Sequence, residues 1–194
     1  MDRYDTVTEV WDPLLRIFHW MLVGAFALAW WSEGRDIRIH LLAGSVIPGL
    51  LMFRLIWGVA GEHHALFASF RPSIAGIMNQ LGHLLRLKAE NHAGHTPIGS
   101  LMIYALLFTL LVLSASGMVL MALQMGLGPF AGWAAHAGFT TEVLIQQVHH
   151  WSFRFLQLLI AVHLGGVAVE SLLQGRNLTA AMITGRKTLR EVEL

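Results

Sequence analysis

The sequence predicts an all-α integral membrane protein, a four-helix bundle with a short interfacial helix between helices two and three. Hydrophobic residues make up 55% of the 194 residues, and the mean hydropathy is +0.58. Only 13% of the residues are charged, whereas soluble domains contain about 25%. Four apolar stretches are each long enough to cross a hydrocarbon core of about 30 Å. Membrane lipid is therefore the first expected partner.

Each apolar stretch is expected to be a helix, because lipid offers no hydrogen-bond partner for backbone N–H and C=O groups. The four predicted helices cover residues 14–32, 41–60, 98–124 and 144–173. We interpret residues 1–194 as a single transmembrane domain.

The long link between the second and third stretches, residues 61–97, contains an amphipathic segment at 72–88. Its apolar residues recur with helical spacing on one face: Ile74, Ile77, Met78, Leu81, Leu84 and Leu85. This spacing predicts an interfacial helix that lies on the membrane surface.

The distribution of Lys and Arg predicts the orientation of the bundle. If the N-terminus is inside, the outer segments carry only Arg35 and Arg38. The inner segments then carry Arg3, Arg16, Arg71, Arg86, Lys88, Arg176, Arg186, Lys187 and Arg190. The positive-inside rule therefore predicts a multi-pass protein with both termini in the cytoplasm.

Composition also excludes several function classes. The chain has no cysteine, which excludes disulfides, covalent c-type haem attachment and cysteine-ligated iron–sulfur clusters. The formal net charge is +1 and there is no long basic tract, so no nucleic-acid partner is expected.

Four of the 11 histidines lie inside or at the rim of predicted membrane helices: His19, His40, His149 and His163. Ionisable residues at such depths are costly and usually functional. A single one is equally well explained by a hydrogen bond to a neighbouring carbonyl. The four match in depth, however, as an inner pair His19/His163 and an outer pair His40/His149. Each pair could bind a planar macrocycle from both faces.

The fourth predicted helix carries one member of each pair. His149 and His163 are 14 residues apart, so they project from one face within about 40° and are separated by about 21 Å along the axis. His150 would point about 140° away from His163, which favours His149 as the ligand. Nearby glycines would permit close approach either of a macrocycle or of another helix: Gly24, Gly44, Gly117, Gly165 and Gly166.

Several motifs resemble those of bacterial di-haem cytochromes b, the cytochrome b561 family, which includes the membrane subunits of Ni,Fe-hydrogenases. The resemblance covers nearly the whole chain. The matching motifs are Val10-Trp11-Asp12-Pro13-Leu14-Leu15-Arg16-Ile17-Phe18-His19-Trp20, His40 with Gly44, Phe53-Arg54-Leu55-Ile56-Trp57-Gly58, Gly94-His95-Thr96-Pro97-Ile98-Gly99, Val148-His149 with His163, and Ala181-Met182-Ile183-Thr184-Gly185-Arg186-Lys187. One departure is the loop Gly61-Glu62-His63-His64, which is richer in histidine than the family pattern.

The resemblance implies two low-spin b haems, with His19, His40, His149 and His163 as the axial ligands of the iron. It also implies electron transfer between quinone or quinol and a partner redox protein, such as a c-type cytochrome or a hydrogenase-like subunit. The expected location is the bacterial cytoplasmic (inner) membrane. Arg16 could pair with a haem propionate on the inner side, whereas Arg154, one turn from His149, could instead snorkel or pair with a propionate.

Two other function classes stay open at this point. One is a membrane anchor subunit of a redox enzyme without a cofactor, and the other is a histidine-lined transporter of metal ions or protons. Transport would favour further carboxylates within the helices, but only Glu170 lies deep in an apolar run. A metal site at His63 and His64 is a weaker alternative to two solvated histidines. The sequence also leaves open whether the chain turns over a substrate as an enzyme by itself.

Overall fold

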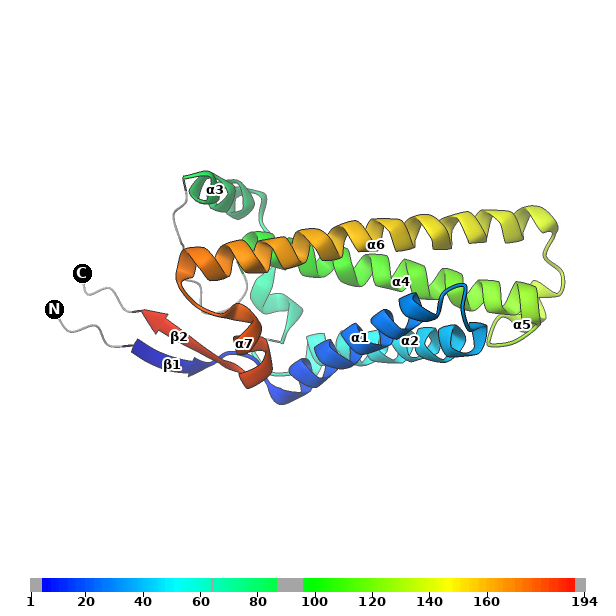
Figure 1. The fold of residues 1–194 in the computed structure, drawn as a ribbon, viewed down its shortest axis with the longest axis horizontal. Helices are drawn as coiled ribbons and strands as arrows, with labels where there is room; N and C mark the ends of the chain where they lie inside the picture. The colour runs from blue at the N-terminus through cyan, green and yellow to red at the C-terminus, as the bar shows by residue number, and fades with distance from the viewer. Residues whose placement is uncertain (1–4, 64, 87–95, 191–194) are drawn as a thin grey trace. The chain divides into compact units, whose positions relative to one another are not determined.

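Four long helices form the body of the protein, as a computed structural model of residues 5–63, 65–86 and 96–190 shows (Figure 1). All four are long and apolar enough to cross a membrane, which confirms the predicted fold class. They are α1 (Pro13–Ser32), α2 (Ile37–Ala60), α4 (Pro97–Met125) and α6 (Phe139–Gln174).

Two of these helices begin earlier than hydropathy predicts. Helix α2 starts at Ile37 rather than at residue 41, and α6 starts at Phe139 rather than at residue 144. The side chain of Asp36 caps α2, because its Oδ1 atom accepts a hydrogen bond from the backbone N–H of Arg38 at 2.9 Å. Such polar first turns are invisible to a search for apolar stretches, because helices continue beyond the hydrocarbon core.

The predicted interfacial helix is present as α3 (Ile74–Leu85). It begins after Ser73, whose side chain accepts a hydrogen bond from the backbone N–H of Gly76 at 3.0 Å. On one face Ile74 is 83% exposed and Met78 is 62% exposed, whereas Gln80 is buried. An exposed apolar face of this kind is typical of a helix in contact with lipid.

Shorter elements complete the described chain: η1 (Phe67–Phe70), α5 (Ala131–Ala134), α7 (Leu178–Thr184), β1 (Asp5–Glu9) and β2 (Arg186–Arg190). The two strands pair antiparallel, with Asp5 opposite Arg190 and Glu9 opposite Arg186 (Figure 1). This two-stranded sheet was not expected, because its strands are separated by nearly the whole sequence. Its pairing brings the two ends of the described chain side by side.

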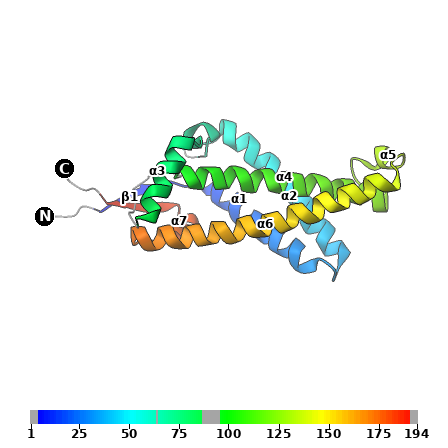
Figure 2. The same ribbon diagram turned by 90° about the horizontal axis from the view of Figure 1, so that it is seen from above.

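The chain divides into two compact units. One consists of Met1–Phe18, Arg54–Tyr104 and Ala161–Leu194, and is called unit 1 below; the other, unit 2, consists of His19–Phe53 and Ala105–Ile160. Helices α4 and α6, both labelled in Figure 2, each contain residues of both units. The single-domain interpretation stays a prediction.

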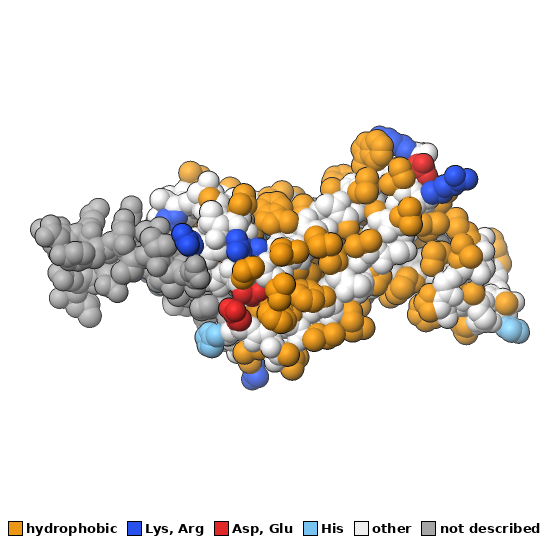
Figure 3. Space-filling view, turned by 90° about the horizontal axis from the view of Figure 1, so that it is seen from below, with side chains coloured by type: hydrophobic (Ala, Val, Ile, Leu, Met, Phe, Trp, Pro, Cys, Tyr) orange, Lys and Arg blue, Asp and Glu red, His pale blue; other side chains and the backbone are white. Residues whose placement is uncertain are grey.

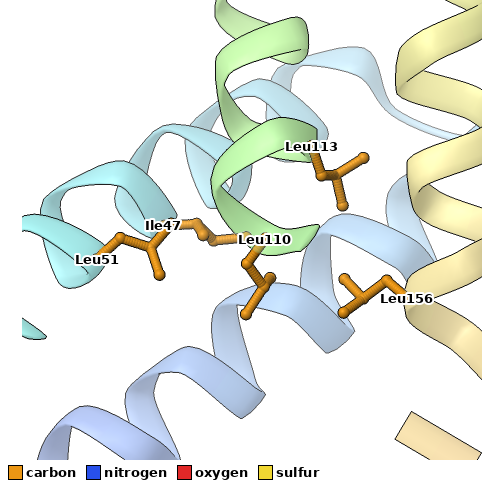
Figure 4. Close-up of a cluster of buried hydrophobic side chains, with 5 residues drawn as sticks. All are labelled: Ile47, Leu51, Leu110, Leu113 and Leu156. Atoms are coloured by element: carbon orange, nitrogen blue, oxygen red, sulfur yellow. The ribbon is translucent and has the colours of Figure 1, made fainter. Parts of the chain in front are cut away.

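A small apolar core lies at the centre of unit 2 (Figure 4). Ile47 and Leu51 come from α2, Leu110 and Leu113 from α4, and Leu156 from α6. Partly buried side chains of α1, among them Leu22 and Phe26, pack against this cluster. The cluster therefore joins α1, α2, α4 and α6 and positions the side chains that these helices carry nearby.

In unit 1, aromatic and charged side chains join the end of α2 to η1. Arg54 is only 3% exposed, and its guanidinium carbon lies 4.5 Å from the ring centre of Phe67. The hydroxyl of Tyr104 donates to the carbonyl of Phe67 at 3.2 Å. Asp12 caps α1 through the N–H of Leu15 at 2.8 Å and accepts from Trp57 Nε1 at 3.3 Å.

The described surface is strongly apolar. Hydrophobic side chains cover most of the face seen in Figure 3, where the Lys, Arg, Asp and Glu side chains are few and lie in small groups. Many large apolar residues of the four long helices are exposed, such as Leu42 and Val59 of α2, Phe108 of α4 and Leu164 of α6. Soluble monomers rarely expose apolar surface on this scale, so the surface fits a lipid environment.

Candidate functional site

The structure brings together the rings of two predicted ligands in unit 2, His40 of α2 and His149 of α6. Their ring centroids are 6.5 Å apart, and the ring planes make an angle of 76°. Both side chains are half-buried. These two histidines come from parts of the chain more than 100 residues apart, so the pairing is a property of the fold.

Backbone carbonyls orient both rings through their Nδ1 atoms. His40 Nδ1 lies 2.9 Å from the carbonyl oxygen of Ala29, and His149 Nδ1 lies 3.1 Å from that of Leu113. An Nδ1–H group that donates to a carbonyl leaves the lone pair of Nε2 free. Histidines that bind metals almost always have this arrangement.

A third group, the hydroxyl of Ser116 on α4, also contacts His149. Ser116 Oγ donates to the carbonyl of Leu113 at 2.9 Å and lies 3.1 Å from His149 Nδ1. Ser116 is buried. His149 is therefore held by two oxygen atoms of α4, whereas the ring of His40 contacts the carbonyl of Ala29 on α1.

The distance between the two rings fits a shared metal centre. An imidazole nitrogen lies about 2 Å from a metal that it binds, so two imidazoles on opposite sides of one metal have ring centres about 6 Å apart. The observed 6.5 Å is close to this value. The donor set also fits, because neutral imidazoles are the ligands of b-type haem iron.

The glycines near this pair of histidines differ in the space that surrounds them. A Cβ atom on Gly117 would lie 3.0 Å from His149 Cε1, so Gly117 gives room to the histidine ring. A Cβ atom on Gly44, one turn after His40, would meet no atom within 4 Å, and the same is true of Gly24. Gly117 is thus explained by contact between helices α4 and α6, while Gly44 borders open space.

The predicted inner pair consists of residues from different units. His19 of α1 belongs to unit 2, and His163 of α6 belongs to unit 1. Both are half-buried, and the ring of His19 makes an edge-to-face contact with Trp20 at 5.0 Å. Their pairing stays a prediction. His150, which the sequence disfavoured as a ligand, is exposed.

The weaker predictions about other histidines and about two arginines stay predictions. His64, His92 and His95 lie outside the described residues. Across 5–63, 65–86 and 96–190, no group of three or more His, Asp or Glu side chains is placed to hold a metal ion. Arg16 donates from Nη1 to the carbonyl of Ile183, and Arg154 is exposed.

Sequence reasoning missed the polar partners of the site residues. Ser116 gave no signal apart from its position before Gly117 in an apolar helix. Glu170 stands out in the sequence as the one carboxylate deep in an apolar run, but the sequence does not reveal its hydrogen-bond partners. The structure shows that Glu170 Oε1 accepts from Gln80 Nε2 at 2.9 Å and from Thr96 Oγ1 at 3.1 Å.

Comparison with known proteins identifies the family. The sequence profile of the prokaryotic cytochrome b561 family matches residues 10–185. The chain is also similar to a "Probable Ni/Fe-hydrogenase B-type cytochrome subunit" of Azotobacter chroococcum mcd 1, with 23% identity over 221 aligned residues that cover 97% of this chain and 92% of the relative. No solved structure matches the chain. The family match includes all four predicted histidine ligands and the four long helices, so the chain belongs to the prokaryotic cytochrome b561 family and is a transmembrane b-type cytochrome of electron transport.

Proposed function

We propose that this cytochrome binds two b haems and transfers electrons between the quinone pool and a partner redox protein. The proposed axial ligands are His40 with His149 at one haem and His19 with His163 at the other. The observation that carries the proposal is the 6.5 Å separation of the His40 and His149 rings, together with the carbonyl contacts at both Nδ1 atoms.

A bound haem would supply reversible one-electron chemistry at its iron. His40 and His149 would hold this haem, and two histidine ligands on one haem iron would favour electron transfer over oxygen chemistry. The residues of the chain orient and shield the site: the carbonyls of Ala29 and Leu113 fix the two rings, and the leucine core of α4 and α6 excludes water. Such fixed, dry surroundings reduce the rearrangement of the nearby dipoles when the charge of the haem changes.

The second haem is proposed from the length and continuity of α6. His163 lies 14 residues beyond His149 on this unbroken helix, which corresponds to about 21 Å along the axis. A haem at each end of this separation would provide a path for electrons across the membrane. The proposal for the inner pair therefore depends on helical spacing and on the family resemblance.

The partner is proposed to be a redox enzyme, because the relative named above is a probable hydrogenase cytochrome subunit. We further propose that the protein lies in the bacterial inner membrane with both termini in the cytoplasm. The excess of Lys and Arg on the predicted inner segments supports this orientation. The pairing of β1 with β2 supports the placement of both ends on one side of the membrane, because it brings them together.

A dithionite-reduced minus oxidised spectrum, combined with haem quantification per chain, tests the proposal. We expect a b-type α band and about two haems per chain, the number that two bis-histidine sites require. His149→Ala and His163→Ala should each lose about one haem. His150→Ala is the matched control, because His150 is the exposed neighbour of His149, and it should keep both haems. One haem in the unaltered protein would refute the second site, and a folded protein without haem would refute both.

A further inference from the structure

Glu170 carries a carboxylate within a membrane-spanning helix. The hydrogen bonds of this carboxylate have no part in the electron-transfer proposal. It is half-buried in the part of α6 that belongs to unit 1. A carboxylate in such a helix is costly and usually marks a functional site. One of its oxygen atoms accepts two hydrogen bonds, from Gln80 Nε2 at 2.9 Å and from Thr96 Oγ1 at 3.1 Å.

The interfacial helix α3 carries Gln80 to this carboxylate. The side-chain oxygen of Gln80 accepts from the backbone N–H of Ile98 at 2.8 Å, which fixes the amide so that its N–H group faces Glu170. Ile74, Met78 and Leu81 on the same helix are exposed. Helix α3 therefore has an apolar surface for lipid and a polar side chain that reaches the carboxylate of α6.

A second acceptor lies one turn further along α6. Gln174 is 7% exposed, and its Oε1 atom is buried and accepts no hydrogen bond from the described residues. A buried carbonyl oxygen without a donor is rare and calls for a partner. Residues four apart on a helix have Cβ atoms about 5–6 Å apart on one face, so Glu170 and Gln174 present two acceptors side by side.

His163 belongs to the same face of the same helix. It precedes Glu170 by seven residues, which is nearly two full turns, or about 10 Å along the axis. A ligand bound at Glu170 and Gln174 would therefore lie close to the haem that His163 is proposed to hold.

We propose that Glu170 and Gln174 bind the head group of a hydroquinone, whose two hydroxyl groups donate to the carboxylate and to the amide oxygen. Two acceptors favour a ligand that carries O–H donors. The lipid-facing surface of α3 favours a lipophilic ligand, and the neighbouring haem ligand His163 favours a redox-active one. This inference rests on the proposed function, of which it names the quinol site.

A hydroquinone that becomes a quinone at this site loses two electrons and two protons. The haem that His163 is proposed to hold would accept the two electrons one at a time, and the carboxylate of Glu170 would accept each proton and release it to water. The quinone that remains has only acceptor oxygens, so it binds less tightly to two acceptors and leaves the site.

The test compares Glu170→Gln with Glu142→Gln in protein purified in lipid nanodiscs. Glu142 is a matched control, because it lies on α6 seven residues from His149 and accepts from Gln124 Nε2 at 3.1 Å. Haem reduction by decylubiquinol is followed by stopped-flow spectroscopy, and dithionite reduction reports the haem content. Cross-linking by an azido-quinone in membranes, followed by peptide mapping, locates the bound head group without any turnover.

We expect Glu170→Gln to slow haem reduction by decylubiquinol at least tenfold while dithionite-reducible haem is unchanged, and Glu142→Gln to behave like the unaltered protein. Gln174→Met, which keeps the side-chain length, should raise the KM for decylubiquinol. The azido-quinone should label residues 161–176 or 74–86, and decylubiquinol should prevent the labelling.

Two results would overturn the inference in different ways. If decylubiquinol reduces the haem of Glu170→Gln and Gln174→Met normally, or if the label is found elsewhere, this site is wrong but the proposed function stands. If decylubiquinol does not reduce the haem of the unaltered protein, the quinol part of the proposed function fails as well. Should Glu170→Gln fail to fold, Gln174→Met and the labelling pattern decide the outcome.

Discussion

Gly117 and His149 are in direct contact, because a Cβ atom on Gly117 would lie 3.0 Å from Cε1 of the histidine ring. The close approach of α4 to α6 thus fixes where the ring can lie. The same helix supplies the carbonyl of Leu113 and the hydroxyl of Ser116 to the ring. Three residues of α4, namely Leu113, Ser116 and Gly117, therefore position one proposed haem ligand.

A larger residue at position 117 should disturb this ligand. Gly117→Val adds methyl groups where the ring of His149 lies, so we expect the ring to shift and the haem content to fall by about one haem per chain. Haem quantification of the purified variant measures this loss. Gly49→Ala on α2 is the control, because a Cβ atom there meets nothing within 4 Å. Full haem content in Gly117→Val would contradict the proposed role of Gly117 in positioning His149.

Removal of the Ser116 hydroxyl should alter the haem potential rather than haem binding. The hydroxyl accepts from His149 Nδ1 when it donates to the carbonyl of Leu113, and such a bond makes the imidazole a stronger electron donor to the iron. Ser116→Ala should therefore raise the midpoint potential of one haem, as a spectroelectrochemical titration would show.

The control for this prediction is Thr109→Ala on the same helix. Thr109 Oγ1 also donates to a backbone carbonyl, but to that of Ala105 at 2.8 Å and not to that of Leu113, which the ring of His149 contacts. Its midpoint potentials should equal those of the unaltered protein. Equal potentials in Ser116→Ala and Thr109→Ala would show that the hydroxyl does not tune the ligand.

A side chain at Gly58 should weaken the packing of unit 1. A Cβ atom at this position would overlap the ring of Phe67, against which the guanidinium of Arg54 is also stacked. We expect Gly58→Ala to destabilise the protein by about 1–3 kcal/mol, as overpacking in a core commonly does. Thermal unfolding in detergent measures the change, and Gly49→Ala again serves as the control. An unchanged Tm would mean that Phe67 moves aside without cost.

The orientation predicts the behaviour of reporter fusions. Alkaline phosphatase fused after residue 194 should be inactive, and a fluorescent protein fused there should be bright, because the C-terminus is proposed to be cytoplasmic. Alkaline phosphatase inserted at Gly34, in the turn between α1 and α2, should be active. Active phosphatase at the C-terminus would reverse the orientation and move Arg35 and Arg38 to the inside.

Local patterns in the sequence predict the fold class, the four spanning helices, the interfacial helix and the family resemblance. These features depend on local patterns, since hydropathy and helical spacing are properties of neighbouring residues. The spacing of His149 and His163 on one helix belongs to this category as well. Local patterns do not report where helices end in polar turns, which is why α2 and α6 begin earlier than expected.

The contacts between distant side chains become visible only in three dimensions. The 6.5 Å approach of His40 to His149, the contact at Gly117 and the hydrogen bond from Gln80 to Glu170 each join helices that are far apart in the sequence. So does the pairing of β1 with β2. Such contacts depend on how helix surfaces pack against one another, and side-chain volume and crossing angle set that packing, not the period of any single helix.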